Sequence, residues 1–255
     1  MEYLQRAFLI LCRRIKRETS LRSKFISSCS SQSFSLPDSI MYYISKNPST
    51  SKLYQNLIQT CKYFFIKNPI IVSPNFHYSR DLGKWCTGKI RFKISQLICK
   101  FWITEIFNLT SMLPKLYKCD AKKVTLENEV ISFNDLSLLT KTVEDIMFIG
   151  VTVKNPDDST VQFEKIFESF FNVKTFRFSF NSAFPNITSK TFNELLKIPH
   201  FLKLQSMNLK DIPDTFDIEA FYVYMKENKT TKFFLFFDKF MSAPYKNRLE
   251  QICFR

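Results

Sequence analysis

Glycine is scarce in this sequence of 255 residues, which contains only 3. Phosphate-binding loops and glycine-rich active-site loops need glycine, because the backbone there adopts conformations that other residues resist. Histidine occurs only as His77 and His200, and neither has a cysteine or a second histidine three or four residues further on, as a helical metal site would require. We therefore expect no metal site and no cofactor.

Long apolar runs are also missing, since none reaches the roughly 18 to 20 residues that a membrane-spanning helix needs. We expect a soluble chain with no membrane partner. The 7 cysteines are an odd number and contain no C-x-x-C pair, unlike zinc sites and disulfide-rich secreted domains. This indicates reduced thiols and a cytoplasmic or nuclear location.

The stretch GKWCTGKI, residues 83–90, matches all but the last position of a phosphate-binding loop. Such a loop needs a preceding strand, a following helix and a Ser or Thr after the lysine. Position 90 is isoleucine, and the preceding stretch SPNFHYSRD is typical of a loop. We expect no nucleotide binding here. His200 beside a strand and the paired acids Asp157 and Asp158 in a turn-forming stretch do not form a catalytic set either, so we expect no enzyme.

The chain is basic, with a net charge of +14, and rich in phenylalanine, of which there are 29. Residues 1–34 carry seven Lys or Arg against two Glu and end in a Ser-rich stretch, so we expect a disordered appendage. A mitochondrial presequence is the alternative interpretation, because the segment is Arg-rich, Ser-rich and poor in acids. A basic charge also permits nucleic-acid binding, but no recognition helix or stacking motif is present, and solvated surface is the preferred explanation.

Two short helical patterns follow in residues 35–66. Ser35 and Asp38 form a typical helix start with Pro37 in the first turn, and Asn-Pro-Ser at 47–49 ends the pattern. Apolar residues at helical spacing predict one face on each helix. These residues are Leu36, Ile40 and Ile44 in the first pattern, and Leu53, Leu57 and Cys61 in the second.

The Leu-Pro opening, the isoleucines three and seven places after the proline, the Pro-containing break, Leu-x-x-x-Leu and the Cys-Lys-x-Phe ending resemble an F-box. Proteins with this module dock onto the Skp-type adaptor of a cullin ubiquitin ligase. Ser39 stands where the family usually has an acid, and Phe64 where it often has Trp. The resemblance implies that the adaptor contacts are Leu36, Pro37, Ile40, Ile44, Leu53, Leu57 and Cys61.

Strand-like and helical pieces alternate in residues 99–255, after a predicted connector at 67–98. The strand-like pieces are CKFWIT, KKVTLE, EDIMFI, VKTFRFSF, LKLQSMNL and TKFFLFF, which start 22 to 29 residues apart. One strand and one helix per unit predict an α/β fold, a divergent leucine-rich-repeat-like solenoid. A compact α/β domain with the same alternation is the alternative.

In a stacked parallel sheet, core pairs at Val124 and Leu126, Ile146 and Phe148, and Phe176 and Phe178 place Thr125, Met147 and Arg177 on the open face. We expect these three to contact a target protein. The final FFLFF is apolar on both faces, so we expect either the C-terminal YKNRLEQI helix or a bound partner to cover it.

The helical module followed by these repeats is similar to the expanded nematode families of F-box-associated proteins. The similarity rests on phrases such as LYQNLIQTCKYFF, LPKLYKCD and TSKTFNELLKIPHF. It implies a non-catalytic substrate receptor of a cullin ubiquitin ligase that holds an unknown target. The alternatives are a repeat-type protein-binding module without a ligase link, and a basic nucleic-acid-binding protein.

Overall fold

A computed structural model describes Ser23, Ser27 and residues 33–79, 83–87, 90–108, 110–181 and 186–253. The predicted appendage and the presequence alternative therefore lie almost entirely outside the described residues. The chain divides into two compact units. Unit 1 comprises residues 1–105 and 111–119, and unit 2 comprises residues 106–110 and 120–255. The fold is mixed α/β with a mostly parallel sheet, as the sequence predicts at this level.

From residue 33 on, three helices come before the strands of unit 1: α3 (Asp38–Lys46), α4 (Ser51–Thr60) and α5 (Lys62–Lys67). α3 begins directly after Pro37, whose carbonyl oxygen accepts the amides of Ile40 and Met41. It ends at Asn47, as the Asn-Pro-Ser stretch predicts. α4 begins at a capping residue, because Oγ1 of Thr50 accepts the amide of Leu53 at 3.1 Å.

Strands follow these helices along the chain, and they belong to unit 1 except for residues 106 and 107. They are β1 (Ile70–Asn75), β2 (His77–Ser79), β3 (Lys84–Thr87), β4 (Ile90–Phe92), β5 (Lys100–Phe107) and β6 (Leu116–Cys119), with 3-10 turns at Ile94–Gln96 and Thr110–Lys115. β2, β3 and β4 form an antiparallel sheet, and β5 lies between β1 and β6. The expectation of a loop over SPNFHYSRD is wrong, because β1 and β2 occupy most of it. Trp85 on β3 and Trp102 on β5 are buried.

Unit 2 carries the parallel strands β7 (Lys123–Glu127), β9 (Asp145–Ile149), β11 (Thr175–Ser179), β12 (Ser206–Ile212) and β13 (Lys232–Phe237), in that order. The last two residues of β5, Ile106 and Phe107, pair with β7. A short parallel pair, β8 (Val130–Ser132) with β10 (Thr152–Lys154), follows separately. Between β9 and β10 the chain turns at Gly150 with φ of +61°, where a Cβ would lie 2.6 Å from Oδ1 of Asn128. Only glycine fits that turn without displacing the asparagine.

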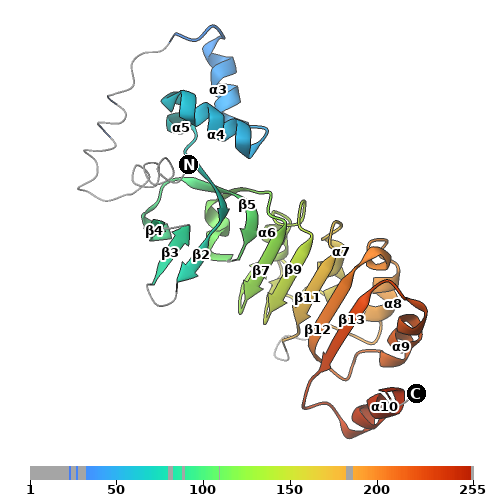
Figure 1. Ribbon diagram of the computed structural model, residues 1–255. Coiled ribbons are helices and arrows are strands. Elements are labelled where there is room, and N and C mark those ends of the chain that lie inside the picture. The colour runs from blue at the N-terminus through green and yellow to red at the C-terminus, as the bar shows by residue number, and fades with distance from the viewer. Residues whose placement is uncertain are drawn as a thin grey trace. The chain divides into compact units, whose positions relative to one another are not determined.

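Short helices connect the strands of unit 2 and lie on one side of them (Figure 1). They are α6 (Phe133–Leu136), α7 (Phe163–Glu168), α8 (Thr191–Leu196), α9 (Ile218–Glu227) and the 3-10 turn Phe201–Lys203, and a further helix, α10 (Ala243–Cys253), follows the last strand. The predicted core pairs on β7, β9 and β11 face these helices, and each of their residues is at most 2% exposed. Phenylalanines fill much of this core, and the ring of Phe163 lies 5.0 Å from those of Phe178 and Phe180.

The start of each strand in unit 2 repeats one backbone pattern. The residue before a strand uses its carbonyl oxygen to accept one or two amides at the start of the next strand. The accepting oxygens belong to Lys122, Glu144, Lys174 and Gln205, which precede β7, β9, β11 and β12 in turn. The same backbone contact therefore recurs where β9, β11, β12 and β13 begin.

Candidate protein-interaction surfaces

Tyr54 fixes the helical module to the strands of unit 1. Its side chain is fully buried and packs with Ile70, Val72 and Trp102. The hydroxyl group donates to the carbonyl oxygen of Asn68 at 2.5 Å and accepts the amide of Ile70 at 3.0 Å. One tyrosine on α4 therefore satisfies the backbone at the point where α5 ends and β1 begins.

The end of α3 is held by two further side chains. Nδ2 of Asn68 donates to the carbonyl oxygen of Ser45 at 3.0 Å. The hydroxyl of Tyr117 donates to the carbonyl oxygen of Lys46 at 3.1 Å. Burial raises the pKa of the Tyr117 hydroxyl above its ordinary value. These contacts give α3 and α4 a defined orientation on unit 1.

An apolar surface, which we call the outer stripe, remains accessible on the helical module. Leu36 is 46% exposed, Ile40 45% and Leu53 43%. Pro37 is exposed as well, and the other members are half-buried. The outer stripe consists of the seven predicted adaptor contacts Leu36, Pro37, Ile40, Ile44, Leu53, Leu57 and Cys61. None of the seven is fully buried.

The core-facing positions of α3 and α4 lie one residue further along the chain. Met41 and Ser45 are buried on α3, and Tyr54 is buried with Ile58 beside it on α4. One residue on a helix corresponds to a rotation of about 100°, so each helix has an inner and an outer apolar stripe. The predicted capping role of Ser35 is wrong, because Pro37 is the residue before the helix and no side chain caps it.

A second surface lies on the face of the unit 2 sheet that the helices leave open. Thr125, Met147 and Arg177 are neighbours on adjacent strands and are all half-exposed. The same row continues through Asn208 on β12 and Phe234 on β13. The register thus brings the three predicted target contacts together and adds two more. Sequence reasoning missed these two because the final apolar strand did not reveal which of its faces points outward.

Charged groups surround Arg177 on this open face. Its Nη2 donates to Oδ1 of Asp145 at 2.5 Å, and Nζ of Lys123 lies 3.6 Å from Oδ2 of the same carboxylate. Nε of Arg177 is buried and has no hydrogen-bond partner among the described residues. Beside this group, hydrogen bonds from Lys174 and Lys122 lower the pKa of Glu144 to about 2. The carboxylates of Asp145 and Glu144 are therefore paired with lysine and arginine side chains. Nε of Arg177 is the donor that stays without a partner among the described residues.

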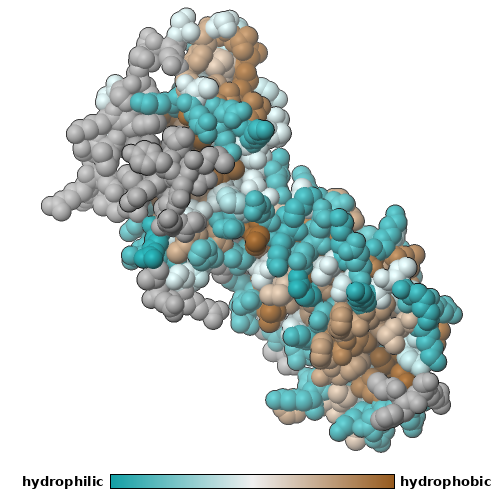
Figure 2. All heavy atoms as spheres, in the orientation of Figure 1, coloured by the Kyte–Doolittle hydropathy of each residue, from teal (hydrophilic) through white to brown (hydrophobic). Residues whose placement is uncertain are grey.

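The end of the sheet is apolar and exposed. Of the two covers expected for β13, the C-terminal helix leaves the open face bare, because Phe234 is 48% and Phe236 52% exposed, and a bound partner remains the other alternative. On α10, the ring of Tyr245 instead lies against Phe237. The Tyr245 hydroxyl donates to the carbonyl oxygen of Phe216. Apolar atoms gather over β13, whereas hydrophilic atoms dominate the surface over β7 and β9 (Figure 2).

The residues considered for chemistry have structural surroundings. A strand, β4, follows residues 88–89 of GKWCTGKI, where a phosphate-binding loop would require a helix. The ring of His200 stacks on Phe167, its Nε2 lies 3.2 Å from the Phe167 carbonyl oxygen, and burial lowers its pKa. Asp157 accepts the amide and the hydroxyl of Ser159 within a turn.

Within the described ranges, no three His, Cys, Asp or Glu side chains are grouped so that they could hold a metal ion. The same part of the chain has no helix of the length and apolarity that crossing a membrane requires. The described geometry offers two accessible surfaces, the outer stripe and the open-face row. Comparisons of the chain with protein-family models, with curated proteins and with solved structures found no match.

Proposed function

We propose that this chain is a non-catalytic protein-interaction adaptor that serves as a substrate receptor of a cullin-type ubiquitin ligase. The outer stripe of the helical module binds the Skp-type adaptor, and the open face of unit 2 binds the target protein. The observation that carries the proposal is the exposure of four of the seven outer-stripe residues, Leu36, Pro37, Ile40 and Leu53, on helices whose opposite side is buried against the fold. Apolar side chains kept at a surface in this way are typical of a protein-binding site.

A divergent leucine-rich-repeat-like arrangement of unit 2 is part of the same proposal. Equivalent core residues recur along the chain at intervals of 22, 30, 31 and 26 residues. They are Val124, Ile146, Phe176, Met207 and Phe233, and they pair in register on successive strands. The repeated backbone contacts at the strand starts support this description, because equivalent units stack in equivalent ways. Such a sheet presents one continuous row of side chains to a partner.

Replacing Pro37 and Ile40 together by alanine should abolish co-purification of the Skp-type adaptor. Burial of one aliphatic side chain at an interface stabilises it by roughly 1.5 to 3 kcal/mol, so loss of Ile40 alone should weaken binding about tenfold or more. The measurement is co-purification from cells expressing tagged chain and adaptor. Circular dichroism should show that the fold is unchanged.

The matched control is the double alanine variant of Asn56 and Gln59, which are exposed on α4 but lie on neither apolar stripe. It should retain the adaptor. If the wild-type chain fails to retain the adaptor while still holding other proteins, the ligase link is wrong. The chain is then a repeat-type binding module.

Met147→Asp and Arg177→Glu, made separately, should remove target proteins from the purified complex while the adaptor stays bound. The first places a charge in the middle of the open-face row, and the second reverses the guanidinium whose Nε lacks a partner. Affinity purification with mass spectrometry is the measurement. Lys197→Glu, a charge reversal at the exposed end of α8, is the control. Retention of every partner in both variants would show that recognition occurs elsewhere.

A further inference from the structure

The last strand of the unit 2 sheet, β13, has one edge that no described strand covers. The amide of Lys232 donates to Gln205 and the amide of Asp238 to Ile212, so the even-numbered residues direct their backbone groups toward β12. Backbone groups of alternate residues in a parallel strand point to opposite sides. The N–H and C=O groups of Phe233, Leu235 and Phe237 therefore face the uncovered edge.

The sequence of this edge is self-complementary. The segment Lys232–Asp238 reads KFFLFFD, which is symmetric about Leu235 except that a lysine begins it and an aspartate ends it. If this segment pairs antiparallel with a copy of itself about Leu235, each residue faces a residue that complements it in charge or apolarity. The pairs are Lys232 with Asp238, Phe233 with Phe237, Phe234 with Phe236, and Leu235 with its own copy.

We propose that β13 pairs antiparallel with β13 of a second copy of this chain, about a two-fold axis at Leu235. The register agrees with the backbone. Phe233, Leu235 and Phe237 all direct their hydrogen-bonding groups outward, and they meet only one another across the axis. They form the hydrogen-bonded pairs of an antiparallel ladder, while Phe234 and Phe236 form the closer pairs whose side chains pack directly. A symmetric contact of this kind closes on itself and stops at two copies.

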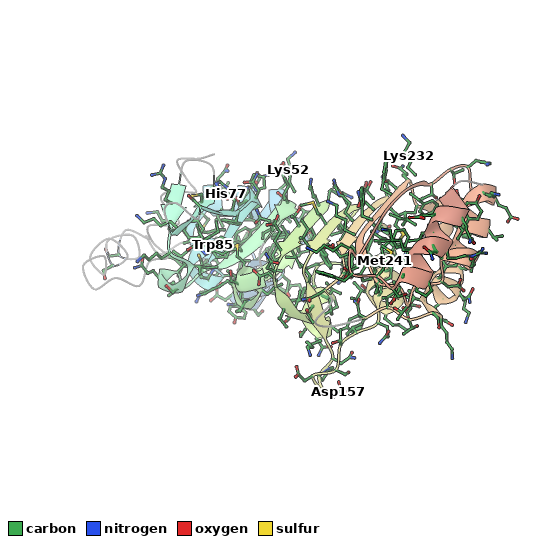
Figure 3. The ribbon with its side chains drawn as sticks, turned by 90° about the horizontal axis from the view of Figure 1, so that it is seen from below. Lys52, His77, Trp85, Asp157, Lys232 and Met241 are labelled. Atoms are coloured by element: carbon green, nitrogen blue, oxygen red, sulfur yellow. The ribbon has the colours of Figure 1, made fainter. Side chains whose placement is uncertain are left out.

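The charges at the two ends of β13 favour a second copy of this chain over a strand from another protein. Lys232 is exposed, and its side chain projects away from the ribbon (Figure 3). The two-fold places it opposite the carboxylate of Asp238, whose Oδ1 accepts the amide of Phe240 at 2.8 Å. Lys239 then stands opposite Thr231, so no lysine of the segment meets another directly. Two Lys–Asp pairs close the ends of the strand pair, and Phe234 and Phe236 become covered.

Charge reversal at the two ends tests this register on the full-length chain. Sedimentation velocity of the wild type over about 1 to 100 µM should show a shift from the chain mass of 30.3 kDa toward twice that value. Lys232→Asp and Asp238→Lys should each raise the dissociation constant about tenfold or more, because each replaces two attractive pairs by two repulsive ones. Mixing the two variants should restore a dimer, since one copy then has two acidic ends and the other two basic ends.

Lys239→Glu, a similar reversal opposite Thr231, should leave the dissociation constant within about twofold. Amide exchange adds an independent measurement, because the amides of Phe233, Leu235 and Phe237 should gain protection as concentration rises. A wild type that keeps the chain mass throughout would overturn the proposal. So would a dimer that both reversals leave intact, a mixture that stays monomeric, or a ladder of larger species, which would indicate open-ended strand addition.

Discussion

Unit 2 should lose about 3 to 5 kcal/mol of unfolding free energy when Phe163 is replaced by alanine. The Phe163 side chain is fully buried, and its ring lies 5.8 Å from that of Phe176 and 5.0 Å from those of Phe178 and Phe180. Truncation to alanine leaves a cavity between α7 and β11 that rigid rings cannot collapse to fill. Domains are typically stable by about 5 to 15 kcal/mol, so this one change should come near to unfolding the unit. Urea denaturation followed by circular dichroism measures the loss.

Phe171 provides the matched control, because it lies just beyond α7 and is 55% exposed. Phe171→Ala should change the unfolding free energy by no more than about 0.5 kcal/mol. Equal losses in the two variants would mean that the aromatic interior of unit 2 is not packed as described.

A second large loss is expected at Tyr54. Tyr54→Ala should destabilise unit 1 by about 3 to 5 kcal/mol, because it removes the fully buried ring between Ile70 and Trp102. Tyr54→Phe keeps the ring but leaves the amide of Ile70 without its 3.0 Å acceptor, which should cost about 1 to 3 kcal/mol. Hydrogen exchange of the α3, α4 and β1 amides measures both changes. Exchange should be fastest in Tyr54→Ala, slower in Tyr54→Phe and slowest in the wild type.

Tyr43→Phe is the corresponding control, since Tyr43 lies on α3 and is 65% exposed. Its exchange rates should match those of the wild type. If Tyr54→Phe behaved like this control, the hydroxyl of Tyr54 would not be what orients the helices on the strands.

The core-facing positions of the first unit 2 strands could be predicted because these strands obey simple alternation. Val124 and Leu126, or Phe176 and Phe178, stand two residues apart with a more polar residue between them, and all four are buried as predicted. The same argument cannot assign the two faces of β13, because its five successive apolar residues show no alternation. Only the hydrogen bonds to β12 show which residues face outward.

The helical module shows a different limit of sequence reasoning. α4 contains two apolar series at helical spacing, Leu53 with Leu57 and Tyr54 with Ile58. Either could have faced the interior by periodicity alone. The deciding contact is the hydroxyl of Tyr54 with the backbone around Asn68, which depends on chain fourteen residues away. The sequence pattern also did not predict strand β1. Pro74 lies within it, and proline is tolerated in a strand only at an edge.

The placement of the tryptophans has a practical consequence. The sequence contains only two, Trp85 and Trp102, and both belong to unit 1. Both indoles are shielded from water in the folded chain, so their emission shifts when unit 1 opens and is silent about unit 2. The amide signal follows both units. Recording the two signals in one titration therefore separates the unfolding of unit 1 from that of unit 2, with no added label.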